Sequence, residues 1–386
     1  DVERSRGLGD VYKRQVSNSL TWEKVYTKNI GLDLNFFNNR LTFSGDIYRR
    51  DTKDMLTKGK TLPSVLGALE PRINAADMKT EGWEISLGWR DLFNLGNKPF
   101  SYNVKFILSD NRSFITRFDN PTGNLDDWYE GCEIGEIWGL VTEGFFKDQA
   151  DIDNHADQWD VTSYPGDRPI EPGDLKYKDL DNNGKINNGS WTVNDPGDYK
   201  VIGNNASRYN YGADFTAEWN GLDFRVLLQG VGKKDWYPRY DSGFFWGQYN
   251  RPFGYMLKAH TGSNVYSEEL DNWDTAYWPR YSAYQTNESS VNRVLTTPND
   301  RYMQDVSYIR LKNLTVGYTI PATLTKKAGI DQIRIYFSGE NLCYWSPLKK
   351  NSKYVDPEAA INRSGVNNNA YYPWAKTFMF GIDITF

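Results

Sequence analysis

The chain has 386 residues, a net charge of −5 and an aromatic content of 15%. No run of about 18 apolar residues occurs, so the sequence excludes a membrane-spanning helix, and the lack of a basic block argues against nucleic acid as a partner. The length fits two ordinary domains or one large β-barrel, whose alternating strands need only moderate hydrophobicity.

No catalytic motif is recognisable, and we expect no enzyme. The two histidines, His155 and His260, lie outside any catalytic pattern, and there is no phosphate loop, nucleophile elbow or paired-histidine metal motif. Cys132 and Cys343 lack metal-ligand spacing and are interpreted as incidental thiols.

Residues 1–19 are interpreted as a non-native or loop leader. The stretch from Asp1 to Gln15 has no apolar core and cannot be a signal peptide. Its GLGDVYKRQ segment resembles translated sequencing-adapter read-through, and the alternative is a loop from a preceding domain. In both cases we expect the chain to be truncated at this end and residues 20–386 to form the folded part.

Alternation with period two predicts nine strands along the chain. They are expected over residues 25–36, 41–48, 83–90, 102–108, 209–219, 222–228, 308–320, 333–337 and 378–386. The phase breaks near Lys312 and Asn313, which indicates a bulge. One further strand-like piece, 137–146, is expected above or within the barrel wall.

The connections between these strands alternate in length. Short turns follow the first, third, fifth and seventh strands, including Asn220-Gly221, a strong hairpin signal. The connections 56–78, 119–205, 232–304 and 343–374 are medium to very long. Outer-membrane barrels show this asymmetry, with short periplasmic turns and long extracellular loops. The sequence therefore predicts an all-β, antiparallel transmembrane barrel.

The odd number of strands indicates an incomplete barrel. Bacterial single-chain barrels have even numbers of strands, and an open sheet would expose unpaired edges to lipid. We therefore expect about nine strands that form the C-terminal portion of a larger barrel.

From residue 20 onwards the chain resembles the SusC/RagA family of TonB-dependent outer-membrane transporters of Bacteroidetes. The stretches that carry the resemblance keep the family's order. They are NIGLDLNFFNNRLTFSGDIYRRDTKDML (29–56), MKTEGWEISLGWR (78–90), PGDLKYKDLDNNGKI (172–186), VIGNNASRYNYGADFTAEWNGLDFRVLLQGVGKKD (201–235), YIRLKNLTVGYTIP (308–321), FSGENL (337–342) and YPWAKTFMFGIDITF (372–386).

The resemblance implies a barrel of about 22 strands with an N-terminal plug, of which the plug, the TonB-binding segment and roughly the first half of the barrel are absent here. It implies an outer-membrane importer of glycans, or in some members peptides, that works with a SusD-like lipoprotein lid and TonB. The end of the chain (Gly381, Ile384 and Phe386) resembles the signal read by the barrel-assembly machinery, although Met379 replaces a usual polar residue.

Two other classes stay open. One is a passive porin or adhesin barrel. The other is a soluble, secreted carbohydrate-binding or hydrolase β-domain, which as an enzyme would need two convergent carboxylates.

The segment from Asp179 to Ile186 matches the first half of a calcium loop. Oxygen-bearing side chains stand at its first, third and fifth positions, Gly184 at the sixth, and the seventh supplies a carbonyl. Ser190 replaces the usual bidentate glutamate, so Asp195 or Asp198 would complete the site. The expected ligands are Asp179, Asp181, Asn183, Lys185, Asp195 and Asp198. The alternative is an Asx-turn loop that binds nothing.

Aromatic residues crowd the connection 236–284. They would stack on a sugar or contact the lid, or they would form the loop's own core or an interfacial girdle. The candidate contacts are Trp236, Tyr240, Trp246, Tyr249, Trp273 and Trp278. Polar residues predicted to face the lumen either line a hydrated interior, pair with each other or hold the plug; they are Asp33, Asp46, Glu84, Arg90, Asp214, Glu218 and Arg225.

Overall fold

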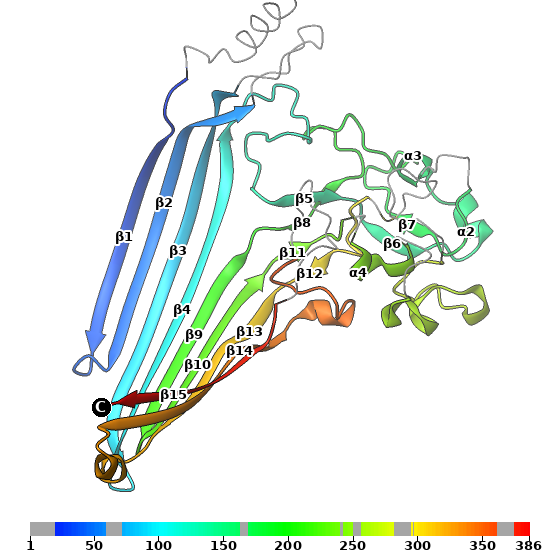
Figure 1. Cartoon of the computed structure of the whole chain (residues 1–386). Helices are drawn as coiled ribbons and strands as arrows, with labels where there is room; N and C mark the ends of the chain where they lie inside the picture. The colour runs from blue at the N-terminus through cyan, green and yellow to red at the C-terminus, as the bar shows by residue number, and fades with distance from the viewer. Residues whose placement is uncertain are drawn as a thin grey trace, which may run out of the picture.

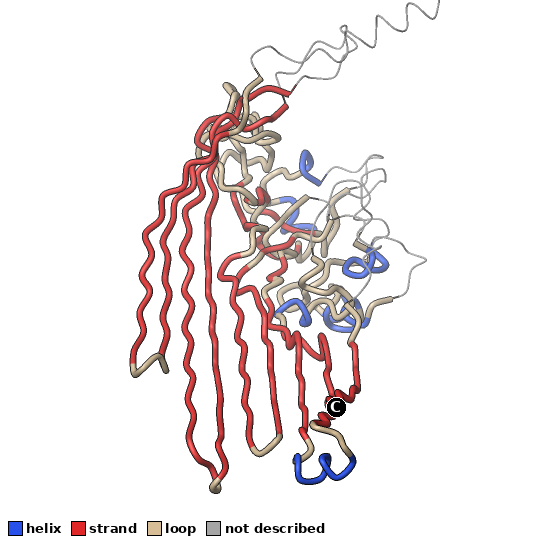
Figure 2. The backbone as a smooth tube through the Cα atoms, turned by 60° about the vertical axis from the view of Figure 1, so that its left-hand side comes forward, coloured by secondary structure: helices blue, strands red, loops and turns tan. Residues whose placement is uncertain are grey.

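The computed structural model describes residues 20–58, 72–162, 169–239, 242–249, 256–281, 295, 297–360 and 374–386. Its main feature is one nine-stranded antiparallel sheet in the order β1-β2-β3-β4-β9-β10-β13-β14-β15. The strands are β1 (Lys24–Phe36), β2 (Leu41–Lys58), β3 (Arg72–Leu95), β4 (Lys98–Arg117), β9 (Arg208–Trp219), β10 (Leu222–Lys233), β13 (Tyr308–Thr319), β14 (Gln332–Trp345) and β15 (Thr377–Thr385). Figures 1 and 2 show them as a single curved wall. The prediction of nine wall strands is confirmed.

Several wall strands extend beyond the predicted bounds. The connection expected at 56–78 is wrong at both of its ends, because β2 and β3 stay paired up to Lys58 and Arg72; its middle part, 59–71, lies outside the described residues. This extension carries polar residues on both faces, as in the pairs Arg50–Thr80 and Asp51–Lys79. A strand that leaves the lipid layer no longer needs an apolar face, so alternation stops before the strand does.

Short connections close the hairpins at one end of the sheet, which is the lower end in Figure 1, and two of them are tight turns. Asn220 and Gly221 have φ values of +47° and +85°, and Gly96 and Asn97 have +57° and +63°. Two consecutive left-handed residues match the right-handed twist of the flanking strands. The long connections lie at the opposite end, which confirms the predicted parity.

The predicted bulge is also confirmed. The register of β13 shifts between Leu311 and Asn313 against β14. Against β10, the consecutive residues Leu227 and Leu228 pair with Asn313 and Leu311, which leaves Lys312 without an opposite residue. Lys312 is therefore the inserted residue, and the inward-facing set of side chains changes phase there.

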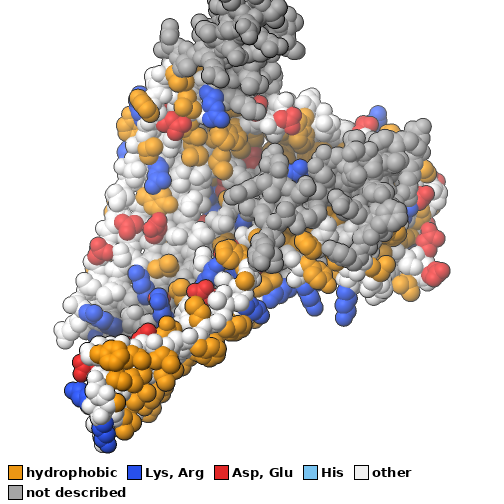
Figure 3. Space-filling view, in the orientation of Figure 1, with side chains coloured by type: hydrophobic (Ala, Val, Ile, Leu, Met, Phe, Trp, Pro, Cys, Tyr) orange, Lys and Arg blue, Asp and Glu red, His pale blue; other side chains and the backbone are white. Residues whose placement is uncertain are grey.

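One face of the sheet carries an apolar band across all nine strands. The register aligns Leu34 with Phe43 and Leu87 on the first strands, and Phe337 with Phe380 on the last. These side chains cover no protein core; Ile30, Phe380 and Phe386 are all more than 80% exposed. Figure 3 shows hydrophobic side chains gathered over the C-terminal strands at the lower end. Such a band is the lipid-facing surface of a barrel wall.

Rings border this band at the end with short turns. Trp89 Nε1 donates to Tyr102 Oη at 2.8 Å, and the rings of Phe93 and Phe100 lie 5.1 Å apart. Trp219 Nε1 donates to the Leu95 carbonyl at 3.1 Å. Aromatic groups with one polar atom suit the boundary between lipid and water.

The long connections pack together into a layer beside the sheet, to the right in Figure 1. It contains three two-stranded pairs: β5 (Glu136–Gly139) with β8 (Lys200–Asn204), β6 (Thr142–Phe145) with β7 (Leu175–Tyr177), and β11 (Asp235–Trp236) with β12 (Gln304–Asp305). Short helices are α2 (Gln149–Asp153), α3 (Trp159–Thr162) and α4 (Gly243–Trp246), and α5 (Ala322–Thr325) lies in the β13–β14 turn.

The piece expected as one strand at 137–146 is instead divided into β5 and β6, which pair with different partners. The division occurs at Leu140, whose N–H donates to the Pro298 carbonyl of another connection at 2.9 Å. Among the helices that the structure describes, none is long and apolar enough to span a membrane.

Candidate functional site

The loop layer has a hydrophobic core of its own. Leu140, Leu175 and Ile186 come from the β4–β9 connection, and Trp246 and Trp278 come from the β10–β13 connection. Leu348 and Ala360 add the β14–β15 connection. Because all three connections contribute, none can bury its apolar side chains without the other two.

Most of the candidate contact rings belong to this core. Trp236, Trp246, Tyr249 and Trp278 are at most 4% exposed. Trp278 stacks on Tyr302 with centroids 5.3 Å apart, and Tyr249 Oη donates to the Pro279 carbonyl at 2.8 Å. In this structure these four rings hold the layer together and do not present a face to a ligand.

Trp273 differs from those four. Its side chain is 37% exposed, with the Lys147 ammonium 5.7 Å from the ring centroid. Tyr240, the sixth predicted contact, lies outside the described residues. Sequence reasoning missed other exposed rings of the loop layer, including Trp128, Trp159 and Tyr354. In the sequence, the only feature that could have indicated these exposed rings was an aromatic residue within a polar connection.

The acidic loop after β7 brings three carboxylates together. Ligand oxygens of Asp179, Asp181 and Asp198 all lie within 4.8 Å of one another. The loop is shaped by Asn182 and Gly184, whose φ values are +59° and +81°. Three carboxylates suit a hard cation such as calcium.

Local hydrogen bonds explain how this cluster forms. Desolvation would raise the pKa of Asp179, but N–H groups led by that of Gly184, at 2.8 Å, hold the pKa below its usual value. Asp198 is fully buried and accepts from the N–H groups of Leu180 and Asn187.

The remaining predicted ligands are placed differently. Asp195 accepts from the N–H and hydroxyl groups of Ser190, at 2.9 and 2.6 Å, and is not in the cluster. Asn183 Oδ1 accepts from the N–H of Lys185 at 2.8 Å. Of the two alternatives for completing the site, the geometry favours Asp198.

The predicted lumen residues lie on the face opposite the apolar band, and some of them pair. Arg225 makes a two-point ion pair with Asp214 across β9 and β10. Arg90 Nε donates to the Asn39 carbonyl at 2.9 Å. Asp46 stands opposite Glu84 in the register. Internal pairing is thus present for Arg225 and Asp214, whereas a hydrated interior stays a prediction.

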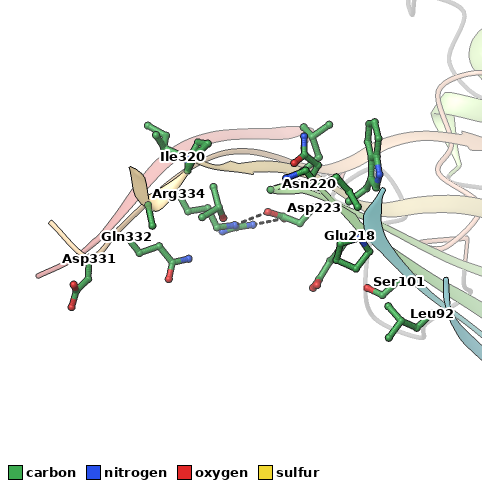
Figure 4. Close-up of a pocket in the computed structure, with 17 residues that line it drawn as sticks. Leu92, Ser101, Glu218, Asn220, Asp223, Ile320, Asp331, Gln332 and Arg334 are labelled. Carbon is green, nitrogen blue, oxygen red and sulfur yellow. Dashed lines mark hydrogen bonds and ion pairs between the residues drawn. The ribbon is translucent and has the colours of Figure 1, made fainter. Parts of the chain in front are cut away.

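A hollow of about 1080 Å³ lies at the short-turn end of the sheet, lined by Glu218, Asp223, Asp331 and Arg334 among others. Figure 4 shows Arg334 of β14 pointing to Asp223 of β10. Their atoms are 2.7 Å apart although β13 lies between the two strands. The pair is possible because Gly317 of β13 faces Asp223, and a Cβ there would lie 2.3 Å from its carboxylate.

A second ion cluster ties the β14–β15 connection to the wall. Arg310 of β13 is 2% exposed and contacts Asp356 and Glu358, and Lys312 binds Glu358 at 2.8 Å. Sequence reasoning missed this cluster because its partners are separated by 46 residues.

The predicted assembly signal lies on an edge strand. Gly381 pairs with Tyr336, whose ring covers it, and Phe386 is 84% exposed at the end of the chain. Its recognition by the assembly machinery stays a prediction.

Known proteins share this architecture. The sequence profile of the family described as "TonB dependent receptor-like, beta-barrel" matches residues 4–201. The chain is 27% identical to TonB-dependent receptor P3 of Formosa agariphila, over 96% of this chain and 35% of that protein. It is 25% identical to TonB-dependent receptor SusC of Bacteroides thetaiotaomicron, over 98% and 34%.

Solved structures agree on the fold. The RagAB peptide transporter superposes with a TM-score of 0.63 at 21% identity, over 95% of this chain and 35% of that one. The chain thus spans about a third of the length of its relatives. Its nine-stranded wall, its lipid-facing band and the profile match agree, and the chain belongs to the TonB-dependent receptor β-barrel family of the outer membrane.

Proposed function

We propose that the chain is part of an outer-membrane active transporter that imports oligosaccharides, or other oligomeric nutrients, without catalysis. The observation that carries the proposal is the wall itself, apolar outside and polar inside, in a chain of this family. A wall of nine strands needs further strands before its lumen admits an oligomer, because diameter grows with strand number.

In this proposal a SusD-like lipoprotein covers the loop layer, and energy reaches the transporter through TonB. Trp273 and the other exposed rings of the layer, which the proposal assigns to sugar stacking or lid contact, have the amphipathic character that such contacts require. The structurally similar RagAB complex is a peptide transporter, and this keeps peptides as the second substrate class.

Uptake by whole cells tests the proposal. The full-length parent protein, co-expressed with a SusD-like lipoprotein, should accumulate labelled oligosaccharides only in cells with functional TonB. Equal uptake without TonB would instead identify a passive porin. A labelled peptide pool that is taken up while the oligosaccharides are not would reassign the substrate class.

A further inference from the structure

Basic side chains stand on the lipid-facing side of the first four strands, just beyond the apolar band. Ile30, Ile47 and Trp83 are aligned in the register and end the band. Two residues further along each strand, toward the long loops, the register aligns a second row. Its members are Lys28, Arg49, Glu81 and Arg112. Because side chains alternate along a strand, this row points to the same side as the band.

A hollow of about 760 Å³ spans this boundary. Ile30, Ile47 and Trp83 line its apolar part. Five cationic side chains line it together with two carboxylates, those of Glu81 and Asp110; the cationic residues are Lys28, Arg49, Lys79, Arg112 and Arg208. The hollow is therefore amphipathic, with its charged part on the extracellular side.

Two ion pairs around the hollow leave the arginine outermost, whereas the carboxylate of Glu81, which is 46% exposed, lies 3.6 Å from Arg49 and 3.5 Å from Lys79. Arg49 binds Asp51 at 3.0 Å, and Arg112 binds Glu133 at 2.6 Å. The two arginine side chains are about half exposed, at 50% and 49%, whereas Asp51 and Glu133 are only 21% and 19% exposed. The acids thus orient the guanidinium groups from behind.

Phe114 brings further positive charge together. The Lys79 ammonium and the Arg112 guanidinium lie 5.2 and 5.0 Å from its ring centroid. Both cations contact the same ring, and all three residues line the hollow. An anion bound in the hollow would therefore meet more than one cation.

We propose that this hollow binds an anionic lipid of the outer leaflet, with its acyl chains against Ile30, Ile47 and Trp83 and its phosphate on the cations. The row lies at the border of the apolar band, where the outer surface of a barrel meets the lipid headgroups. Arginine forms two-point hydrogen bonds with phosphate, and basic pockets at a membrane surface select anionic headgroups. The site is separate from the lumen and from substrate import.

Native mass spectrometry on the full-length parent protein in a neutral detergent tests the proposal, with bisphosphorylated lipid A as the probe. Lys28→Gln combined with Lys79→Gln should weaken lipid A binding about tenfold. Glu81→Gln, which removes a lining carboxylate, should strengthen it. Lys105→Gln combined with Arg225→Gln, on the lumen face of β4 and β10, is the matched control and should change nothing.

Opposite results would overturn the assignment. Equal binding of fully dephosphorylated lipid A would leave only acyl-chain contact, and competition by millimolar inorganic phosphate alone would indicate a free-anion site. Weaker binding by Glu81→Gln would also contradict the proposal. That variant keeps every cation, so it remains decisive if the double lysine variant fails to assemble.

Discussion

At the scale of single residues, glycines opposite tyrosines shape the wall. Tyr336 covers Gly381, Tyr48 covers Gly82, and a Cβ on either glycine would meet the ring at 2.3 to 2.6 Å. The packing of an aromatic ring over a glycine on the neighbouring strand helps to fix the register of a curved sheet.

This packing gives a test of the role of Gly381. Gly381→Ala should destabilise the pairing of β15 by about 1–3 kcal/mol, because the added methyl group overpacks the Tyr336 ring. In a Tyr336→Ala background the same change should cost almost nothing. Denaturant unfolding of the full-length parent measures both. A cost that persists without the ring would contradict this packing role of Gly381.

Arg310 provides a second test at this scale. Arg310→Met should cost about 3–5 kcal/mol, because Asp356 loses its partner in a largely buried site and Glu358 keeps only Lys312. Hydrogen exchange should then accelerate across residues 346–360. The control is Arg225→Met, whose ion pair is half-exposed and should contribute under about 1 kcal/mol. Equal effects of the two variants would contradict the proposal that Arg310 holds the β14–β15 connection against the wall.

At the scale of elements, the acidic loop is the clearest prediction. Calcium in about hundredfold excess over its dissociation constant should stabilise the full-length parent by about 2.7 kcal/mol relative to chelator. Asp181→Asn should abolish this shift, whereas Asp195→Asn should not, because its carboxylate binds Ser190 instead. A thermal-shift titration with calcium against chelator measures the stabilisation in each variant. No shift in the unaltered protein would leave the loop as an Asx turn.

His260 makes the loop layer sensitive to acid. It lies between Trp278 and Tyr249 and beside Gln248, and burial lowers its pKa to about 4. The unfolded chain, with a pKa near 6.5, takes up the proton first, so stability is complete above pH 6.5 and falls as the pH drops toward 4.

The loss of folding free energy due to His260 should reach on the order of 3 kcal/mol at pH 4. His260→Leu should flatten this part of the stability profile between pH 6.5 and 4, as measured by hydrogen exchange of the loop layer. The profile of His155→Gln serves for comparison, since burial also lowers the pKa of His155. A His260→Leu profile as steep as that of the unaltered protein would contradict the assignment.

At the scale of the whole molecule, both edges of the sheet are open. β1 and β15 each pair on one side only among the described strands. In lipid, unpaired backbone groups are costly, so the chain expressed alone should not acquire heat-modifiable migration on gels. The full-length parent should acquire it, and membrane extraction followed by unheated electrophoresis measures the difference. Heat-modifiable migration of the chain alone would show that it closes in another way.

The sequence predicted the wall far better than the loop layer. Strands in lipid must alternate, so Phe378 to Phe386 could be recognised directly, and even Lys312 was visible as a break in phase. The burial of Trp246 and Trp278 had no such periodic signal, because an irregular core is defined by contacts between distant segments. For the same reason the choice between Asp195 and Asp198 required the folded loop.

The shared core of the three long connections also limits how proteins of this family diversify. A new specificity cannot be acquired by exchanging one connection, since Trp278, Leu175 and Leu348 would each lose packing partners supplied by the others. The wall, in contrast, takes almost no part in that core. Recombination between relatives should therefore preserve the three connections as one inherited block, while the strands beneath them drift independently.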